Sequence, residues 1–284
     1  MTKQAPRPFV QVLLYVGLII VTASVLYPVM MVCKKAFEPG QQFALSASPL
    51  PRDLTLDHFQ TLFTERSSSG DLMFLRQTIN SVIVALLTTI VGLFLSCTAA
   101  YALSRFRFPG RKTGLTMFLV VQMFPATLLL LPLYVILDKL GLLNSVMGLV
   151  LVYATTAIPF CVWTLKGYFD SLPRELEEAA RIDGASPWRI FRTIILPLSR
   201  PALAVTGLFS FMTAWNEFVM ASTFMTEQSK YTLPVLIQST VTEHTANYGT
   251  FAAGAIVTSV PVMIAFYVLQ KYLVGGLTAG AVKG

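Results

Sequence analysis

Residues 171–200 read SLPRELEEAARIDGASPWRIFRTIILPLSR and predict two short helices joined by a turn. Ser171 and Pro173 predict the start of the first helix, because a hydroxyl at the N-cap and a proline in the first turn are both favoured there. Three acids follow where carboxylates complement the helix N-terminus: Glu175, Glu177 and Glu178. Gly184 predicts the end of this helix, since glycine readily adopts the left-handed conformation found at helix C-termini.

The second helix is predicted to begin with Ser186 as N-cap and Pro187 at its first position, and Pro197 is expected to break or end it. The two helices form an elbow, defined here as residues 171–200. We expect the elbow to expose an apolar and aromatic surface made of Ala179, Ala180, Ile182, Trp188, Ile190 and Phe191. Two interpretations remain open: docking into a groove of a soluble partner, or resting on lipid headgroups as an amphipathic helix.

The rest of the chain is strongly apolar. Of its 284 residues, 55% are hydrophobic and only 12% are charged, whereas soluble domains carry about 25% charged residues. The net charge of +7 is spread over short segments between apolar blocks, which argues against a nucleic-acid partner. A transmembrane helix needs about 20 apolar residues. The sequence therefore predicts an all-α integral membrane protein, one domain over residues 1–284, with six spans at about 9–32, 78–103, 113–137, 145–165, 201–225 and 248–274.

The distribution of Lys and Arg predicts the orientation, because cytoplasmic loops are enriched in these residues. Fourteen cations fall on the side that carries both termini and the elbow, and seven on the other side. The segment 105–112 has four cations and no acid. Both termini and the elbow are therefore expected in the cytoplasm, and the loops 33–77 and 226–247 outside, the first with a short helix near 56–63.

The elbow resembles the coupling motif of ATP-binding-cassette importer permeases, with matching residue types at matching spacing. The resemblance implies a type I importer fold in the inner membrane and a separate ATPase docked on the elbow. The residues to which it assigns this coupling role are Glu178, Ala179, Ala180, Asp183, Gly184, Ile194, Leu196 and Pro197.

Several further stretches resemble the maltose/maltodextrin-type carbohydrate permeases. They are Tyr101-Ala102, 105–110, 122–126, 163–169 and the tail 276–284. This resemblance implies import of maltodextrin-type oligosaccharides by a heterodimer with a second permease, two ATPase subunits and an external sugar-binding protein. It also implies that the loop around Thr240, Glu243, His244 and Asn247 contacts the binding protein. The tail, with Thr278, Gly280 and Lys283, would enter the space between the ATPase subunits, although its glycines suggest that the sixth helix ends near residue 274.

No organised catalytic, metal or nucleotide site is recognisable in the sequence. The nearest approach to a phosphate loop, Gly110-Arg111-Lys112-Thr113, lacks the required pattern, so ATP and Mg²⁺ are expected on the partner ATPase, with no cofactor bound by this chain. The cysteines are expected to be packing residues, and His58 and His244 to be solvated in polar loops.

Trp215, Asn216 and Glu217 are expected inside the fifth span, where a carboxylate is costly unless it is paired or hydrated. They could line a translocation path for a sugar, or Glu217 could form a buried bond between helices. Alternative functions are a related importer permease for galacto-oligosaccharides or trehalose, an ion-coupled secondary sugar transporter, or a membrane enzyme. A secondary transporter would be expected to show paired internal repeats, and a membrane enzyme would need clustered catalytic residues. Neither feature is recognisable in the sequence.

Overall fold

The computed structural model describes residues 8–41, 48, 50, 51, 53–67, 70–241 and 246–281. Throughout these residues the fold is helical, and β-structure is limited to isolated bridge residues, among them an antiparallel pair formed by Val241 and Ala246. The all-α prediction is therefore confirmed. The chain divides into two compact units, residues 1–66 with 237–259 and residues 67–236 with 260–284, where the sequence predicted one domain.

The first unit contains α1 (Pro8–Phe37), α2 (Asp57–Thr64) and the first turns of α13 (Tyr248–Ala281). The 29 residues Phe9–Phe37 are long and apolar enough to cross a membrane. Lys34 and Lys35, in the last turn of α1, are buried, and their ammonium groups donate to the carbonyls of Ser48 and Gly40, respectively. These two bonds fasten the segment that follows α1 to the helix end.

His58 is buried in α2 rather than solvated, which corrects the prediction from the sequence. Its side chain packs on Gly249 so closely that a Cβ added there would overlap the ring. The ring Nε2 also lies 3.1 Å from the carbonyl oxygen of Glu38. The prediction of a short helix near 56–63 is confirmed by α2, but a polar residue in an irregular-looking loop gave no sign of this packing.

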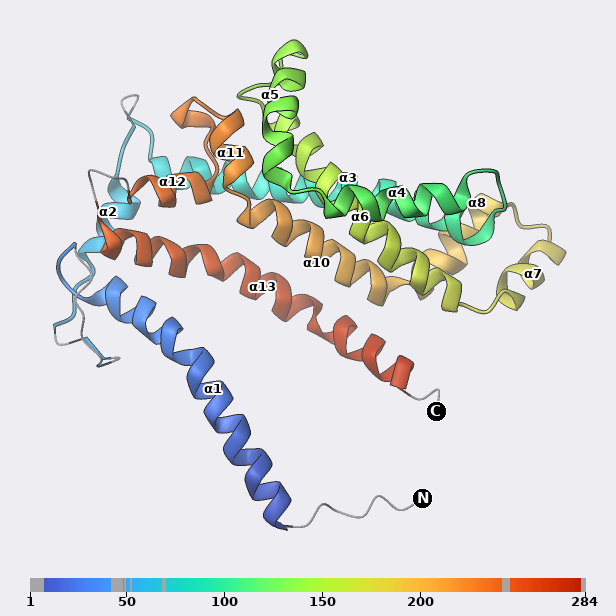
Figure 1. Cartoon of the computed structure of the whole chain (residues 1–284), viewed down its shortest axis with the longest axis horizontal. Helices are drawn as coiled ribbons and strands as arrows, with labels where there is room; N and C mark the ends of the chain where they lie inside the picture. The colour runs from blue at the N-terminus through green and yellow to red at the C-terminus, as the bar shows by residue number, and fades with distance from the viewer. Residues whose placement is uncertain are drawn as a thin grey trace. The chain divides into compact units, whose positions relative to one another are not determined.

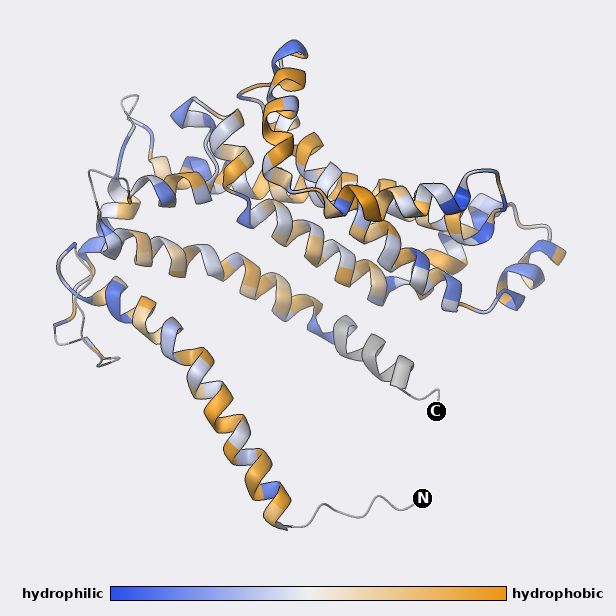
Figure 2. Cartoon of the chain, viewed as in Figure 1, coloured by the Kyte–Doolittle hydropathy of each residue, from blue (hydrophilic) through white to orange (hydrophobic). Residues whose placement is uncertain are grey.

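In the second unit, α3 (Met73–Arg105), α6 (Val146–Ser171) and α10 (Arg200–Asn216) pack against one another along their lengths, and α4 (Arg111–Met123) lies against α6 (Figure 1). Trp215, Tyr153 and Phe169 are among the largest fully buried side chains. Hydrophobic residues cover most of α4 and of α5 (Leu130–Lys139), and hydrophilic residues gather at helix ends (Figure 2). This pattern suits helices that end at a membrane surface.

The expected third span, 113–137, is broken. The helix α4 ends at Met123, the 3₁₀ turn η1 (Ala126–Leu129) follows, and α5 (Leu130–Lys139) leaves at 96° to α4. Pro125 explains the break, because proline has no N–H to continue a helix and disfavours helical backbone at the residue before it. Phe124 is accordingly extended, with ψ at 132°.

The expected fifth span, 201–225, is also interrupted. The helix α10 ends at Asn216, Glu217 is extended with ψ at 128°, and α11 (Val219–Phe224) begins two residues later. Glu217 therefore lies at a helix break and not well inside a helix. The sixth helix is longer than predicted: α13 continues to Ala281 and not to an end near residue 274. Its glycines do not end it, because glycine weakens a helix by about 1 kcal/mol per residue without excluding it.

The loop 226–247 is largely ordered by helices of its own. It contains η3 (Gln228–Lys230) and α12 (Leu233–Ser239). Side chains at the start of α3 hold the first part: Asn80 donates to the carbonyls of Ser229 and Tyr231, and the hydroxyl of Ser81 accepts from the N–H of Leu233. This part of the loop is thus fixed to the helix bundle of the second unit.

Candidate functional site

The elbow leaves the bundle at the end of α6 and returns at the start of α10. It consists of α7 (Glu175–Ile182), α8 (Pro187–Ile190), the π-helical turn η2 (Phe191–Ile195) and α9 (Leu196–Leu198). In Figure 1 α7 projects beyond the ends of the long helices of its unit. The final segment, from Pro187 to Leu198, meets α10 at an angle of 79°.

Three of the predicted signals for the start or end of a helix are confirmed, and one is wrong. Gly184 has φ at +79°, as a glycine after a helix often does, and the hydroxyl of Ser186 accepts from the N–H of Arg189 at 3.3 Å. Ser171 is not a cap: it is the last residue of α6, and its hydroxyl donates back to the carbonyl of Tyr168. The residue at the N-cap of α7 is Arg174.

Pro197 was expected to break or end the second helix, and this helix ends one residue later, at Leu198, before the 79° bend into α10. The helical path continues to Leu198, and the N–H of Ser199 still donates to the carbonyl of Ile195 at 3.0 Å. The π-helical turn Phe191–Ile195 comes directly before the proline. Such a widened turn changes the carbonyl pairing where proline supplies no N–H, so the helix can include Pro197 in its last turn before it ends.

A buried ion pair anchors α7 to the bundle. One carboxylate oxygen of Glu177, Oε1, lies 2.5 Å from Nε of Arg105 at the end of α3, and the two side chains are only 3% and 4% exposed. The other oxygen, Oε2, accepts from the hydroxyl of Tyr101 at 3.5 Å and lies 3.9 Å from Arg181. Removing one partner of such a pair leaves an uncompensated buried charge, at a cost of about 3–5 kcal/mol.

The guanidinium of Arg105 also holds the link between α6 and α7. It donates to the carbonyl of Leu172 at 3.3 Å and to the hydroxyl of Ser104 at 3.1 Å. Ser104 in turn donates to Asp170 at 2.6 Å, and Asp170 pairs with Lys166. One cation at the end of α3 therefore fixes both the exit of α6 and the first turn of α7.

The side of α8 and η2 that faces the bundle is hydrophobic. Ile190, Phe191 and Ile195 are at most 4% exposed and share a core cluster with residues of α3 and α6. The rings of Phe191 and Tyr101 lie 4.7 Å apart. Ile190 and Phe191 were expected on the exposed surface, and this expectation is wrong, because η2 turns them toward the aromatic residues of α3 and α6.

The opposite side of the elbow is exposed. Ile182 is 87% and Trp188 61% exposed, and Leu176 and Ala179 are exposed beside them. The residues of the motif divide between the two sides. Glu178, Ala179, Asp183, Gly184 and Pro197 are exposed, whereas Ala180, Ile194 and Leu196 are half-buried and pack on the core cluster. The elbow is thus a braced structure that presents a small apolar surface outward.

Glu217 acts as a cap at the break between α10 and α11. Its carboxylate accepts from the N–H groups of Met220 at 2.7 Å and Ala221 at 3.0 Å, and from the hydroxyl of Tyr153 at 2.7 Å. Trp215 is 1% exposed and stacks on Phe211. Of the three residues considered for a translocation path, Asn216 alone is exposed. The geometry favours the interpretation of Glu217 as a buried tie between helices.

The residues predicted to contact a binding protein are only partly described. Thr240 donates its hydroxyl to the carbonyl of Ile237, and the side chain of Asn247 accepts from the N–H of Thr250 in the first turn of α13. Glu243 and His244 lie outside the described residues. Of the predicted ATPase-contacting residues, Thr278 and Gly280 belong to α13 and Lys283 lies outside the described residues.

Sequence reasoning missed Glu177 and Asn144 as organising residues. Asn144 has φ at +54°, and its side-chain oxygen accepts from the N–H groups of Thr226 and Glu227 at 2.7 and 3.0 Å. It thereby joins the α5–α6 turn to the end of α11. Asn after Gly141 is a recognisable turn signal, but nothing local indicates the partner 82 residues away.

A bundle with interrupted spans and a braced elbow between its last two long helices defines a multi-pass membrane transport component. The family of binding-protein-dependent transport system inner membrane components matches residues 92–278, and the chain belongs to this family. It is therefore a permease subunit of an ATP-binding-cassette importer.

Relatives with assigned transport roles match nearly the whole chain. The galactooligosaccharides transport system permease protein GanQ of Bacillus subtilis is 41% identical over 95% of this chain and 94% of its own. The maltodextrin transport system permease protein MdxG of the same organism is 35% identical over 100% of both chains. The maltose/maltodextrin permease MalG of Escherichia coli is 39% identical over 99% of this chain and 98% of its own.

A solved structure supports the same fold. A chain of a bacterial ABC transporter that imports the acidic polysaccharide alginate matches with a TM-score of 0.76, covering 96% of this chain and 100% of that one. Its sequence identity is 24%, so this likeness concerns the fold alone.

Proposed function

We propose that the chain imports neutral oligosaccharides of the maltodextrin or galacto-oligosaccharide class across the cytoplasmic membrane. The support is the similarity to MdxG, MalG and GanQ over nearly the whole chain. Their identities of 35–41% do not separate the two sugar classes, and a trehalose-type substrate stays as a further candidate. Hydrolysis of ATP, with its Mg²⁺, belongs to a partner chain.

The elbow is the docking site for that ATPase. The observation that carries this proposal is the contrast between its two sides: a buried ion pair and an aromatic core below, and exposed Ile182, Trp188 and Ala179 above. A lipid-resting amphipathic helix needs no such bracing, because the headgroup region adapts to it. A surface that must transmit force to the bundle needs to be held rigidly, and this one is.

The family supports the rest of the assembly that we propose. The chain pairs with a second permease, two ATPase subunits and an external sugar-binding protein, with both termini and the elbow in the cytoplasm. The loop containing Thr240 and Asn247 faces the binding protein, with Glu243 and His244 in the same segment. The tail that includes Thr278, Gly280 and Lys283 contacts the ATPases.

The translocation path passes the break between α10 and α11. Its exposed polar residue is Asn216, whose amide can donate to and accept from sugar hydroxyls. Trp215 and Glu217 form the wall behind it, because the indole is buried and the carboxylate is already bonded to three donors. A role of Glu217 in binding sugar directly would require these bonds to be exchanged.

Uptake by the reconstituted complex tests the proposal. Proteoliposomes containing the permease pair and its ATPase, supplied with binding protein, are given labelled maltotriose, a galactotriose and trehalose, with and without internal ATP. We expect ATP-dependent uptake of one of these sugars that survives a proton ionophore. Uptake without ATP that the ionophore abolishes would instead support an ion-coupled carrier.

The docking of the ATPase is tested separately with Ile182→Glu. This change places a charge on the most exposed apolar residue of α7 without touching the buried anchor. We expect co-purification of the ATPase and uptake to fall together, while the permease itself remains in the membrane. The matched control is Leu198→Glu, which places the same charge on an exposed leucine near the bend into α10. Equal losses of ATPase co-purification and uptake in both variants would show that the docking surface is not centred on α7.

A further inference from the structure

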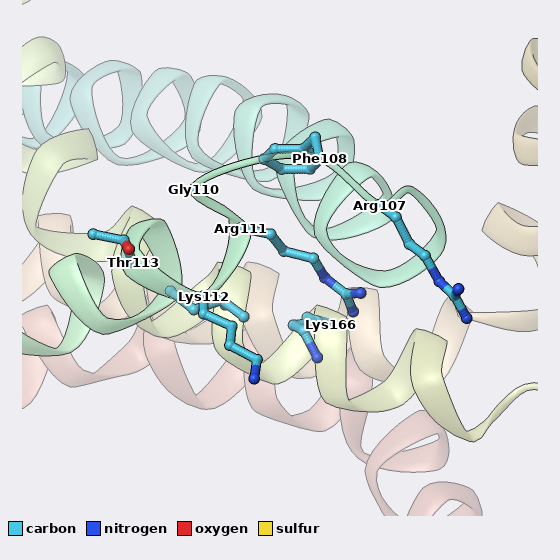
Figure 3. A pocket seen from close by; sticks show the side chains of 8 residues that line it. Arg107, Phe108, Gly110, Arg111, Lys112, Thr113 and Lys166 are labelled. Atoms are coloured by element: carbon cyan, nitrogen blue, oxygen red, sulfur yellow. The ribbon is translucent and has the colours of Figure 1, made fainter.

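A basic pocket lies where the α3–α4 loop meets α6. Its volume is about 540 Å³. The residues that line it are Arg107, Phe108, Gly110, Arg111, Lys112, Thr113, Leu115 and Lys166. Half of them are cations, and in Figure 3 the charged groups of Arg111, Lys112 and Lys166 extend to the same side of the loop. The pocket also lies at the N-terminal end of α4, where the helix dipole adds positive potential.

Most of this charge is not neutralised within the described part of the chain. Lys166 pairs with Asp170, which also accepts from Ser104. Arg111 uses its Nε to donate to the carbonyl of Leu103 at 2.6 Å, which fixes the side chain, and its terminal nitrogens make no hydrogen bond with the other described residues. The side chains of Arg107 and Lys112 make no hydrogen bond or ion pair with the other residues that the structure describes.

This arrangement suits a phosphate group. Guanidinium groups bind phosphate oxygens through paired hydrogen bonds, and lysines add point charges around them. A fixed arginine, the lysine Lys112 and the Asp170-paired Lys166 together offer both kinds of contact. The surroundings favour a phosphate that carries hydrocarbon: Leu115 and the 44%-exposed Phe108 line the pocket, and exposed apolar residues continue along α4 at Met117, Leu119, Val120 and Val121.

We propose that this pocket binds the phosphate headgroup of an anionic phospholipid, with the acyl chains lying along the exposed apolar side of α4. Basic pockets between transmembrane helices at the cytoplasmic level are suited to such headgroups. A bound lipid would brace the α3–α4 loop against α6, close to the cation Arg105 that anchors the elbow. The inference rests on the chain being a multi-pass membrane protein and on the proposed orientation, which places this loop on the cytoplasmic side, and it is independent of which sugar the chain carries.

The test measures the affinity of the purified full-length complex for phosphatidylglycerol and for phosphatidylcholine. Native mass spectrometry reports the fraction of the complex that carries each lipid. The test variant is the double substitution Arg111→Gln with Lys112→Gln, and Lys112→Gln alone guards against misfolding, since this amine supports no described contact. Each cation near an anionic lipid surface is worth about a fivefold change in affinity, so the double variant should bind phosphatidylglycerol roughly 25-fold more weakly.

The matched control is Arg192→Gln with Arg200→Gln, which removes two exposed cations of the elbow and its exit but none from the pocket. Selective weakening of phosphatidylglycerol binding in the pocket variants, with the control unchanged, supports the proposal. Equal weakening in the control would show diffuse surface attraction instead of a site, and no weakening in either pocket variant would also overturn it. Inorganic phosphate or ATP that displaces the lipid at equal concentration would identify the occupant as a free phosphate compound and refute the choice of a lipid.

Discussion

Substitution of Glu177 by alanine tests whether the buried ion pair holds the elbow in place. The change leaves the guanidinium of Arg105, 4% exposed, without its carboxylate. Breaking such a pair costs about 3–5 kcal/mol. This destabilisation has an upper limit. Once α7 detaches from the bundle, water solvates Arg105 again, so the destabilisation cannot exceed the free energy of local opening of the elbow.

Hydrogen exchange measures this local opening directly. The relevant amides are those of Asp183, Gly184 and Ala185, which donate to carbonyls within α7 at 2.9–3.1 Å. A loss of 3–5 kcal/mol corresponds to a roughly 100- to 4,000-fold fall in protection. We expect a fall of that size, or complete loss of protection where the native opening energy is smaller, while the amides in the middle of α3 stay protected.

Two variants make the result interpretable. Glu175→Ala removes an exposed acid from the same first turn, and its effect should stay near 0.3–1 kcal/mol, the scale of a helix-dipole interaction. The double variant Arg105→Met with Glu177→Leu removes both charges together and should recover most of the protection, since apolar replacement of a buried pair is often neutral. Protection in Glu177→Ala that matches Glu175→Ala would refute the role of the ion pair as an anchor.

The other predictions concern separate parts of the chain. In Gly184→Asp the new Cβ meets no atom within 4 Å, and the positive φ adds about 1–2 kcal/mol of strain. The chain should therefore insert normally into the membrane but lose ATPase co-purification and uptake. Normal co-purification and uptake would show that the ATPase does not dock here. Gly249→Ala should lower the Tm because its Cβ would overlap the ring of His58, and His58→Ala in the same chain should relieve the overlap; an unchanged Tm in Gly249→Ala alone would contradict that contact. Deletion of residues 278–284 should leave the complex assembled but reduce uptake per complex, whereas full uptake would make the tail dispensable. Glu217→Ala leaves two N–H groups and a tyrosine hydroxyl without their acceptor, so we expect a loss of about 3 kcal/mol measured as a lower Tm; a raised KM for sugar with an unchanged Tm would restore the direct sugar-binding interpretation.

The features that the sequence predicted well are those with local causes. The glycine at 184 and the Ser186–Pro187 cap act through their own backbone and neighbours, and both are found as expected. Long apolar segments likewise define helices without reference to a partner. The break at Pro125 also had a local cause, since proline cannot continue a helix, but the apolar run across it suggested one uninterrupted span.

The features that the sequence could not supply depend on residues far apart in the chain. The local reasons for an acid near a helix N-terminus apply equally to Glu175, Glu177 and Glu178. Only the position of Arg105, 72 residues earlier, selects the middle one for burial. The direction of Phe191 is decided in the same way, because the π-helical turn rotates it onto Tyr101.

The two anchors of the elbow lie on different helices, and this determines what a docked partner could move. The first turn of α7 is held to the end of α3 by the Glu177–Arg105 pair, while η2 passes through Leu198 into the sharp bend that begins α10. Between these anchors, the turn around Gly184 is supported by bonds to α7 alone in the described structure. A force applied at the exposed Ile182 would therefore load α3 and α10 together. Since these helices also pack against each other and against α6, a rigid elbow would displace the bundle as a unit, whereas an elbow without its ion pair would absorb the same force by bending at α7.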